Sequence, residues 1–190
     1  MKYKEHKQYR LPGHDYSRDG YYFVTICTKD RKHFFGNVTG GEMYLSPIGW
    51  IAYECWLEIP QRFLGVYLDE FVVMPNHTHV IVIIDRGGDV VRRNNHARRN
   101  TPRRVPTEGL PFRSGIGPLI EGSLSSIINH YKGNVKKCCN KSNHENFNWQ
   151  PRFYDRIIRD RQALDAVRCY IWNNPLKWER DRNNVDHIFM

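Results

Sequence analysis

The sequence of 190 residues lacks several features that would assign it to a class at once. It has no apolar run near the roughly 20 residues that a transmembrane helix needs, and residues 1–7, MKYKEHK, lack the apolar segment of a secretory signal. Its five cysteines are odd in number and form no CxxC pair. This spacing argues against a zinc finger and favours reduced thiols. We therefore expect a cytoplasmic protein with no membrane segment.

Acidic residues are also scarce, and this deficit is more informative. Twenty acidic residues against 29 lysines and arginines give a formal charge of +9 and a pI near 9.4. Such an excess favours a polyanionic partner, either nucleic acid or an acidic membrane face. Aromatic residues make up 13% of the chain, and bases stack on exposed aromatic rings. Together, charge and aromatic content favour nucleic acid.

Hydrophobic periodicity predicts alternating strands and helices. β-branched and aromatic runs predict strands at residues 21–28, 66–74, 77–84 and 153–159. Helical spacing and capping residues predict helices from Ser46-Pro47 to Pro60, over 118–139 and over 160–174. We expect an α+β fold of the ferredoxin-like kind, with helices packed on one face of an antiparallel sheet.

Residues 85–115 differ from the rest of the chain. They contain three arginine pairs together with glycine, asparagine and proline, and almost no apolar periodicity. This composition predicts a basic, flexible insertion within a single domain that spans residues 1–190. The sequence assigns the insertion no role.

Two histidines stand at the start of the third predicted strand. Because side chains alternate along a strand, His77 and His79 should point to one face and Thr78 to the other. Imidazoles placed in this way can share a metal ion. The alternative is that both are ordinary surface or packing residues, which is the commoner situation for an isolated HxH.

The last predicted helix carries a second pair. Tyr170 and Asn174 are four residues apart and therefore lie on one helical face, where the amide oxygen of Asn174 could bind a metal beside the phenol. The alternative is a half-buried core tyrosine followed by a helix cap before Pro175. Tyr131 is a rival nucleophile, but the residue four positions later is Val135, which cannot bind a metal.

Three motifs in this order, PNHTHVIVII, WQPRFYDRIIRD and YIWNNPLKW, resemble those of the single-tyrosine HUH transposases, in particular the REP-associated tyrosine transposases. The resemblance implies that His77, His79 and Asn174 bind a divalent ion, Mg²⁺ or Mn²⁺, and that Tyr170 is the nucleophile. Other members carry glutamine where this chain has Asn174, and a bulky apolar residue where it has Thr78. These three ligands are electrically neutral, so the full charge of the ion would face the substrate.

The same resemblance implies an HUH endonuclease fold and a DNA transposase activity. Such an enzyme cleaves and rejoins hairpin-flanked single-stranded DNA through a 5′-phosphotyrosine, and relatives form both monomers and homodimers. The alternative is a catalytically idle DNA- or RNA-binding protein of the same fold. We expect Trp149-Gln150-Pro151-Arg152 of the second motif to pack the last strand and helix together. Candidate phosphate contacts are Arg10, Lys29, Arg31, Lys32, Lys132, Lys136, Lys137, Arg152 and Arg156.

Overall fold

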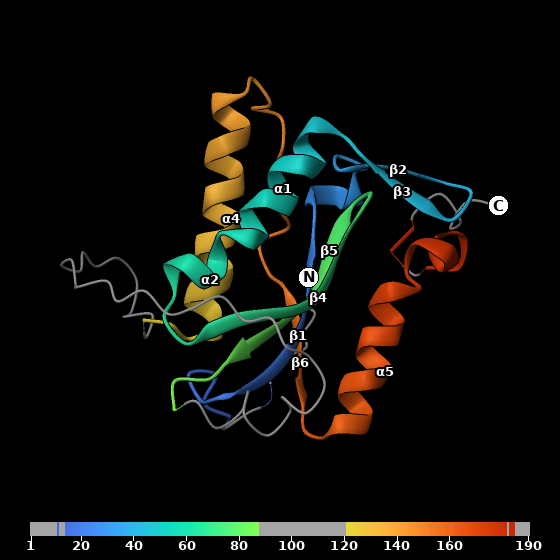
Figure 1. Ribbon diagram of the computed structural model, residues 1–190. Coiled ribbons are helices and arrows are strands. Elements are labelled where there is room, and N and C mark those ends of the chain that lie inside the picture. Colours follow the sequence, from blue (N-terminus) through green and yellow to red (C-terminus); the bar gives the residue numbers. More distant parts are fainter. Residues whose placement is uncertain (1–10, 12–13, 88–120, 182, 185–190) are drawn as a thin grey trace, which may run out of the picture.

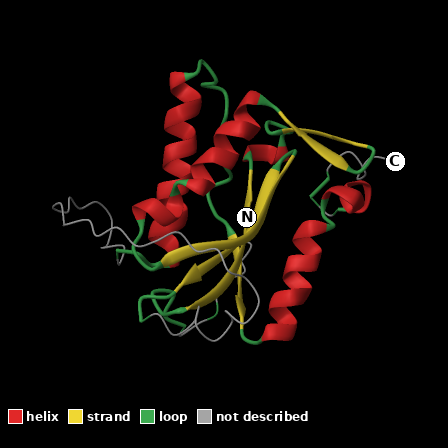
Figure 2. Cartoon of the chain, in the orientation of Figure 1, coloured by secondary structure: helices red, strands yellow, loops and turns green. Residues whose placement is uncertain are grey.

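A four-stranded antiparallel sheet forms the centre of the protein (Figures 1 and 2). The computed structural model describes residues 11, 14–87, 121–181, 183 and 184. The sheet order is β4-β5-β1-β6, and each neighbouring pair is antiparallel. Its strands are β1 (Gly20–Cys27), β4 (Val66–Met74), β5 (His77–Ile84) and β6 (Tyr154–Ile158). This order is that of a ferredoxin-like fold, so the predicted α+β class is confirmed.

Two of the main helices begin at the capping residues that the sequence indicates, Ser46 and Asp160, whereas the helix predicted from residue 118 begins at Leu124, after Ser123. Side-chain oxygens of Ser46, Ser123 and Asp160 each accept a backbone N–H of the first helical turn. The helices are α1 (Pro47–Leu57), α2 (Ile59–Arg62), α4 (Leu124–Lys141) and α5 (Arg161–Trp172).

The helices occupy both faces of the sheet, which corrects the prediction that they share one face. Helices α1 and α4 pack with Val24, Val80 and Val82 in the larger apolar core. Helix α5 packs on the opposite face, in a smaller core that includes Ile81 and Ile158. Figure 1 shows α5 separated from α1 and α4 by the sheet. The alternation of β1 and β5 residues between the two cores follows from strand geometry.

Strand β5 lies between β4 and β1, and all eight of its residues are buried. A strand covered on both faces must be apolar throughout, which explains the run Val80–Ile84. Its two histidines are the polar exceptions on the α5 face. Pro75-Asn76 joins β4 to β5, and the pairing of Met74 with His77 confirms the predicted hairpin.

Several elements differ from the sequence prediction. Residues that the sequence did not indicate as strands form the hairpin of β2 (Gly36–Thr39) and β3 (Glu42–Leu45). Short 3-10 helices follow β1 and α5, namely η1 (Lys29–Arg31) and η2 (Pro175–Arg180). Pro60 does not end α1, which stops at Leu57, but lies in the first turn of α2.

Most of the basic insertion predicted at 85–115 lies outside the described residues, which stop at 87 and resume at 121. All five cysteines are free thiols, as expected. Among the helices of the described ranges, none combines the length and apolar character required to span a bilayer.

Candidate active site

Both histidines of the HxH motif are buried on the face of the sheet that α5 covers. His77 is 0% exposed and His79 is 1% exposed. Their Nε2 atoms lie 3.0 Å apart. The second ring nitrogens have separate partners, since Nδ1 of His77 lies 2.9 Å from Asn76 Oδ1 and Nδ1 of His79 lies 2.9 Å from Thr25 Oγ1. The two Nε2 atoms therefore meet at one point, in the arrangement required of two ligands to one metal.

The carboxylate of Asp181, which was not predicted from the sequence, lies beside the two histidines. Asp181 follows η2, and its carboxylate lies with the imidazole nitrogens of His77 and His79 in a group whose ligand atoms are all within 4.8 Å of one another. These three groups can hold a metal ion. In the sequence, Asp181 could have been noticed as an acidic residue shortly after the predicted end of the last helix. Nothing in the neighbouring residues indicated that η2 folds the chain back towards the histidines.

Asn174 lies beside this group and is 2% exposed. It lies two residues beyond the end of α5, whose C-cap is Asn173. Asn174 is therefore not the cap of this helix, which was the alternative to a metal ligand. Asn174 Nδ2 donates to Asp181 Oδ2 at 3.3 Å. Its Oδ1 is buried, and within the described part of the chain it has no hydrogen-bond partner. A buried oxygen of this kind is costly unless something binds it, so the amide fits a metal ligand.

Tyr170 extends from the last turn of α5 to the histidines. Its hydroxyl lies 3.2 Å from His79 Nε2, while its side chain remains 38% exposed. The ring of Phe23, on β1, packs edge-on against that of Tyr170 at a centroid distance of 5.9 Å. The phenol is thus positioned by packing on one side and open to solvent on the other, as a nucleophile for a large substrate requires.

The rival nucleophile, Tyr131, is inaccessible. It is 0% exposed on α4, stacks on Trp56 at a centroid distance of 3.7 Å, and donates its hydroxyl to Ala52 O at 3.1 Å. Burial raises the pKa of Tyr131 well above its usual value of 10.0. A phenol that is both covered and harder to ionise cannot attack a phosphodiester.

A cleft of about 750 Å³ opens beside Tyr170, between the edge strand β6 and helix α5. Aromatic rings line the cleft on the side of the sheet, apolar side chains line it on the side of α5, and three cationic side chains lie around it. The main lining residues are Phe23, Tyr154, Arg156, Ala163, Ala166, Val167, Tyr170, Asn174, Lys177, Arg180 and Asp181. Of the three cations, only Arg156 was among the predicted phosphate contacts; Lys177 and Arg180 were missed.

Three of the predicted phosphate contacts bind the protein's own backbone or side chains. Lys132 Nζ donates to Gln150 O at 2.6 Å, and burial lowers its pKa. Lys136 donates to the carbonyl of Phe147 at 2.5 Å, and Arg31 donates to the Asn183 side chain at 2.9 Å. The remaining described candidates are exposed, namely Lys29, Lys32, Lys137, Arg152 and Arg156. Arg10 lies outside the described residues.

Trp149 packs, but not where the sequence analysis placed it. Its indole N–H donates to Lys132 O on α4 at 3.1 Å, and its ring contacts Phe35 and Phe147. A single bridge pairs it with Thr28 after β1. Trp149 therefore joins α4 to the end of β1, and not β6 to α5.

Comparison with known structures identifies the fold. A REP-associated tyrosine transposase, solved bound to a REP hairpin, superposes with a TM-score of 0.54 and 17% identity, over 89% of this chain and 74% of that one. The chain thus has the fold of the HUH transposases. A structure described as a proposed transposase of Deinococcus radiodurans gives a TM-score of 0.43 and 13% identity, over 86% of this chain and 95% of that one. A likeness at that level does not establish a common fold.

Sequence comparison defines the family. The chain is 35% identical over 179 residues to an uncharacterised protein of Haemophilus influenzae, which covers 93% of this chain and 92% of the relative. The chain belongs to the family of that Haemophilus protein. No protein-family profile matches the sequence.

Proposed function

We propose that this protein cleaves and rejoins single-stranded DNA, with Tyr170 as nucleophile and a divalent metal held by His77, His79, Asn174 and Asp181. The observation that carries the proposal is the distance of 3.2 Å between the Tyr170 hydroxyl and His79 Nε2. It brings a solvent-accessible phenol from α5 to the imidazoles of β5, while the other candidate phenol is buried. The alternative, an idle binding protein, has no need of this pairing.

The donor set fits Mn²⁺ or Mg²⁺. Two imidazole nitrogens with amide and carboxylate oxygens suit Mn²⁺ well, and the oxygens also suit Mg²⁺. Because Asp181 is a carboxylate, this ligand set carries one negative charge. The three ligands predicted from the sequence would have formed a neutral set. When bound, the metal supplies Lewis acidity and a template for the scissile phosphate.

The protein's residues do the covalent chemistry. The Tyr170 oxygen forms a bond to the phosphorus, and the bond from the phosphorus to the 3′-oxygen breaks. The phenolic proton is lost to solvent and the leaving 3′-oxygen takes one up, which leaves a 5′-phosphotyrosine and a free 3′-hydroxyl. The bond energy of a phosphodiester is retained, so another 3′-hydroxyl can reverse the step and join strands without ATP.

The surroundings of Tyr170 support an unpaired substrate strand. The cleft beside the phenol offers the aromatic rings of Phe23 and Tyr154 to a base, and the cations Arg156, Lys177 and Arg180 to phosphates. A base can enter such a cleft only when it is not paired. The fold neighbour was solved with a REP hairpin, so hairpin-flanked single strands are the first substrates to test.

The decisive experiment uses labelled single-stranded hairpin DNA and Mn²⁺, followed by denaturing gel electrophoresis. Wild-type protein should form a denaturation-resistant adduct, and Tyr170→Phe should form none while binding the DNA with nearly the same affinity. Tyr154→Phe is the matched control, because it removes a hydroxyl from the same cleft and should retain the adduct. An adduct in Tyr170→Phe would refute the assignment of the nucleophile. Tight binding without an adduct on varied hairpins would favour the idle binding protein.

Metal dependence is tested separately. Chelation should abolish the adduct, and added Mn²⁺ should restore it. His77→Ala and His79→Ala should each lose both metal binding and the adduct. Metal-stimulated cleavage that survives in either variant would contradict the ligand assignment.

A further inference from the structure

Asn76, in the turn between β4 and β5, holds an amide side chain in one fixed orientation. It is 0% exposed. Its Nδ2 donates to two backbone carbonyls, Arg31 O at 3.0 Å and Asn183 O at 2.7 Å. Its own carbonyl accepts from the backbone N–H of Thr28 at 2.9 Å. Backbone and side chain are therefore both held by hydrogen bonds to other segments.

These contacts determine which atom faces His77. Carbonyl oxygens only accept hydrogen bonds, so the nitrogen of the amide must face Arg31 and Asn183. The amide oxygen then faces His77 Nδ1, at 2.9 Å. An amide oxygen also only accepts, so Nδ1 of His77 must carry a proton. A neutral imidazole has one N–H, and Nε2 is left with its lone pair.

We infer that Asn76 is a positioning residue for the metal site, which fixes His77 in its Nδ1–H tautomer and turns Nε2 towards the metal. The inference rests on the metal site proposed above. Partners that orient metal-bound histidines in this way raise metal affinity by about 10–100-fold. His79 is not fixed in the same way, because the hydroxyl of Thr25 can either donate to or accept from its Nδ1.

The same amide connects His77 to the segment that carries Asp181. The carbonyl of Asn183 accepts from Asn76 Nδ2, and the N–H of Asn183 donates to Asp181 Oδ1 at 2.6 Å. One chain of hydrogen bonds thus runs from the imidazole of His77 through Asn76 and Asn183 to the carboxylate of Asp181. Two candidate ligands that are far apart in the sequence are held together by a side chain that binds no metal itself.

The test compares Asn76→Ala with Asn76→Asp, using the full chain without DNA. Nitrogen-15 NMR of the metal-free protein reports the tautomer of His77, and calorimetric titration with Mn²⁺ reports affinity. Both are measured at about pH 8, above the usual imidazole pKa. Wild-type protein should show the Nδ1–H tautomer. Asn76→Ala should populate the Nε2–H tautomer and bind Mn²⁺ about 10–100-fold more weakly.

Asn76→Asp separates positioning from a merely structural role. The carboxylate keeps an acceptor for His77 Nδ1 but loses both donor bonds to carbonyls, so it should lower stability at least as much as alanine. It should nevertheless retain the Nδ1–H proton and bind Mn²⁺ more tightly than Asn76→Ala. Val135→Ala, in the core on the other face of the sheet, controls for lost stability and should leave the tautomer and Mn²⁺ affinity unchanged.

An Nε2–H tautomer in the wild-type protein, or wild-type Mn²⁺ affinity in Asn76→Ala, would overturn the inference. So would Mn²⁺ affinities that simply follow the stability of the variants. Failure of the wild-type protein to form a DNA adduct is a separate result, which would refute the proposed cleavage and leave the tautomer measurement standing.

Discussion

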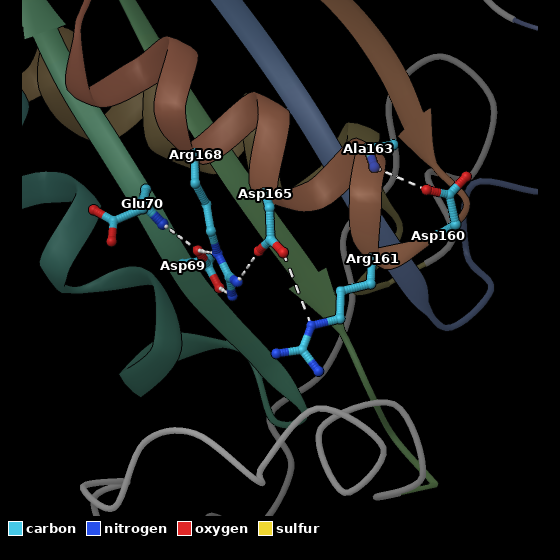
Figure 3. A network of polar contacts seen from close by, with 7 residues as sticks. All are labelled: Asp69, Glu70, Asp160, Arg161, Ala163, Asp165 and Arg168. Carbon is cyan, nitrogen blue, oxygen red and sulfur yellow. Dashed lines mark hydrogen bonds and ion pairs between the residues drawn. The ribbon is translucent and has the colours of Figure 1, made fainter.

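Arg168 attaches the helix that carries Tyr170 to the sheet, and Arg168→Ala should loosen that attachment. Its guanidinium donates through Nε to Asp69 Oδ1 at 2.7 Å and through Nη2 to Asp69 Oδ2, and a third bond reaches Asp165 at 3.0 Å (Figure 3). Asp69 lies on β4 next to an irregularity in its pairing with β5, between Leu68 and Phe71. The bond between Arg168 and Asp69 is therefore a link between α5 and β4.

The structure sets the magnitude of the effect. The side chain of Asp69 is 14% exposed and that of Arg168 is 36% exposed. The pair thus lies between exposed pairs, which contribute about 0.2–1 kcal/mol, and buried pairs, which lose about 3–5 kcal/mol when one partner is removed. We expect Arg168→Ala to lower the free energy of unfolding by about 2 kcal/mol. For a chain of this size the Tm should fall by about 4–8 °C.

Urea denaturation and calorimetry measure this loss, and Arg161→Ala is the matched control. Arg161 lies on the same helix, but its contact with Asp165 is 3.8 Å long, and both side chains are more than half exposed. That variant should lose at most about 0.5 kcal/mol. In a double-mutant cycle, Arg168→Ala combined with Asp69→Asn should cost less than the sum of the single changes. Equal losses in Arg168→Ala and Arg161→Ala, or strict additivity in the cycle, would refute the reasoning.

Three further predictions concern Tyr131, Tyr22 and the Asp181 carboxylate of the proposed metal site. Tyr131→Phe removes the hydrogen bond to Ala52 O and should lower the free energy of unfolding by about 1 kcal/mol, as measured by urea denaturation. Adduct formation should be unchanged. Loss of the adduct without loss of stability would reinstate Tyr131 as the nucleophile. Burial raises the pKa of Tyr22 to about 12. The stability that the buried, neutral phenol of Tyr22 contributes should be complete below about pH 10. It should be lost as the pH rises towards 12, because in that interval the phenol ionises only in the unfolded chain. Tyr22→Phe should remove this alkaline loss in urea titrations, and an unchanged pH profile would contradict it. Asp181→Asn should weaken Mn²⁺ binding at least about tenfold by calorimetry, whereas unchanged affinity would exclude Asp181 as a ligand.

Features that depend on local periodicity could be predicted from the sequence alone. Alternation along β5 was enough to place His77 and His79 on one face. Helical spacing was not enough for Tyr170 and Asn174, because α5 ends at Trp172; both nevertheless line the same cleft. The caps Ser46 and Asp160 located the starts of α1 and α5, since a cap acts within one turn of the chain. The role of these residues in catalysis stays a proposal that the adduct experiment must test.

Which distant groups meet depends on tertiary packing. The Tyr170 hydroxyl reaches His79 across 91 residues because α5 packs on the face of the sheet opposite α1 and α4, and no local pattern specifies a face. Asp181 joins the site because η2 turns the chain back after Pro175. Asn76 faces His77 through its oxygen because two remote carbonyls occupy its nitrogen. Each of these contacts depends on the packing of segments far apart in the sequence, and sequence periodicity carries no information about such distances.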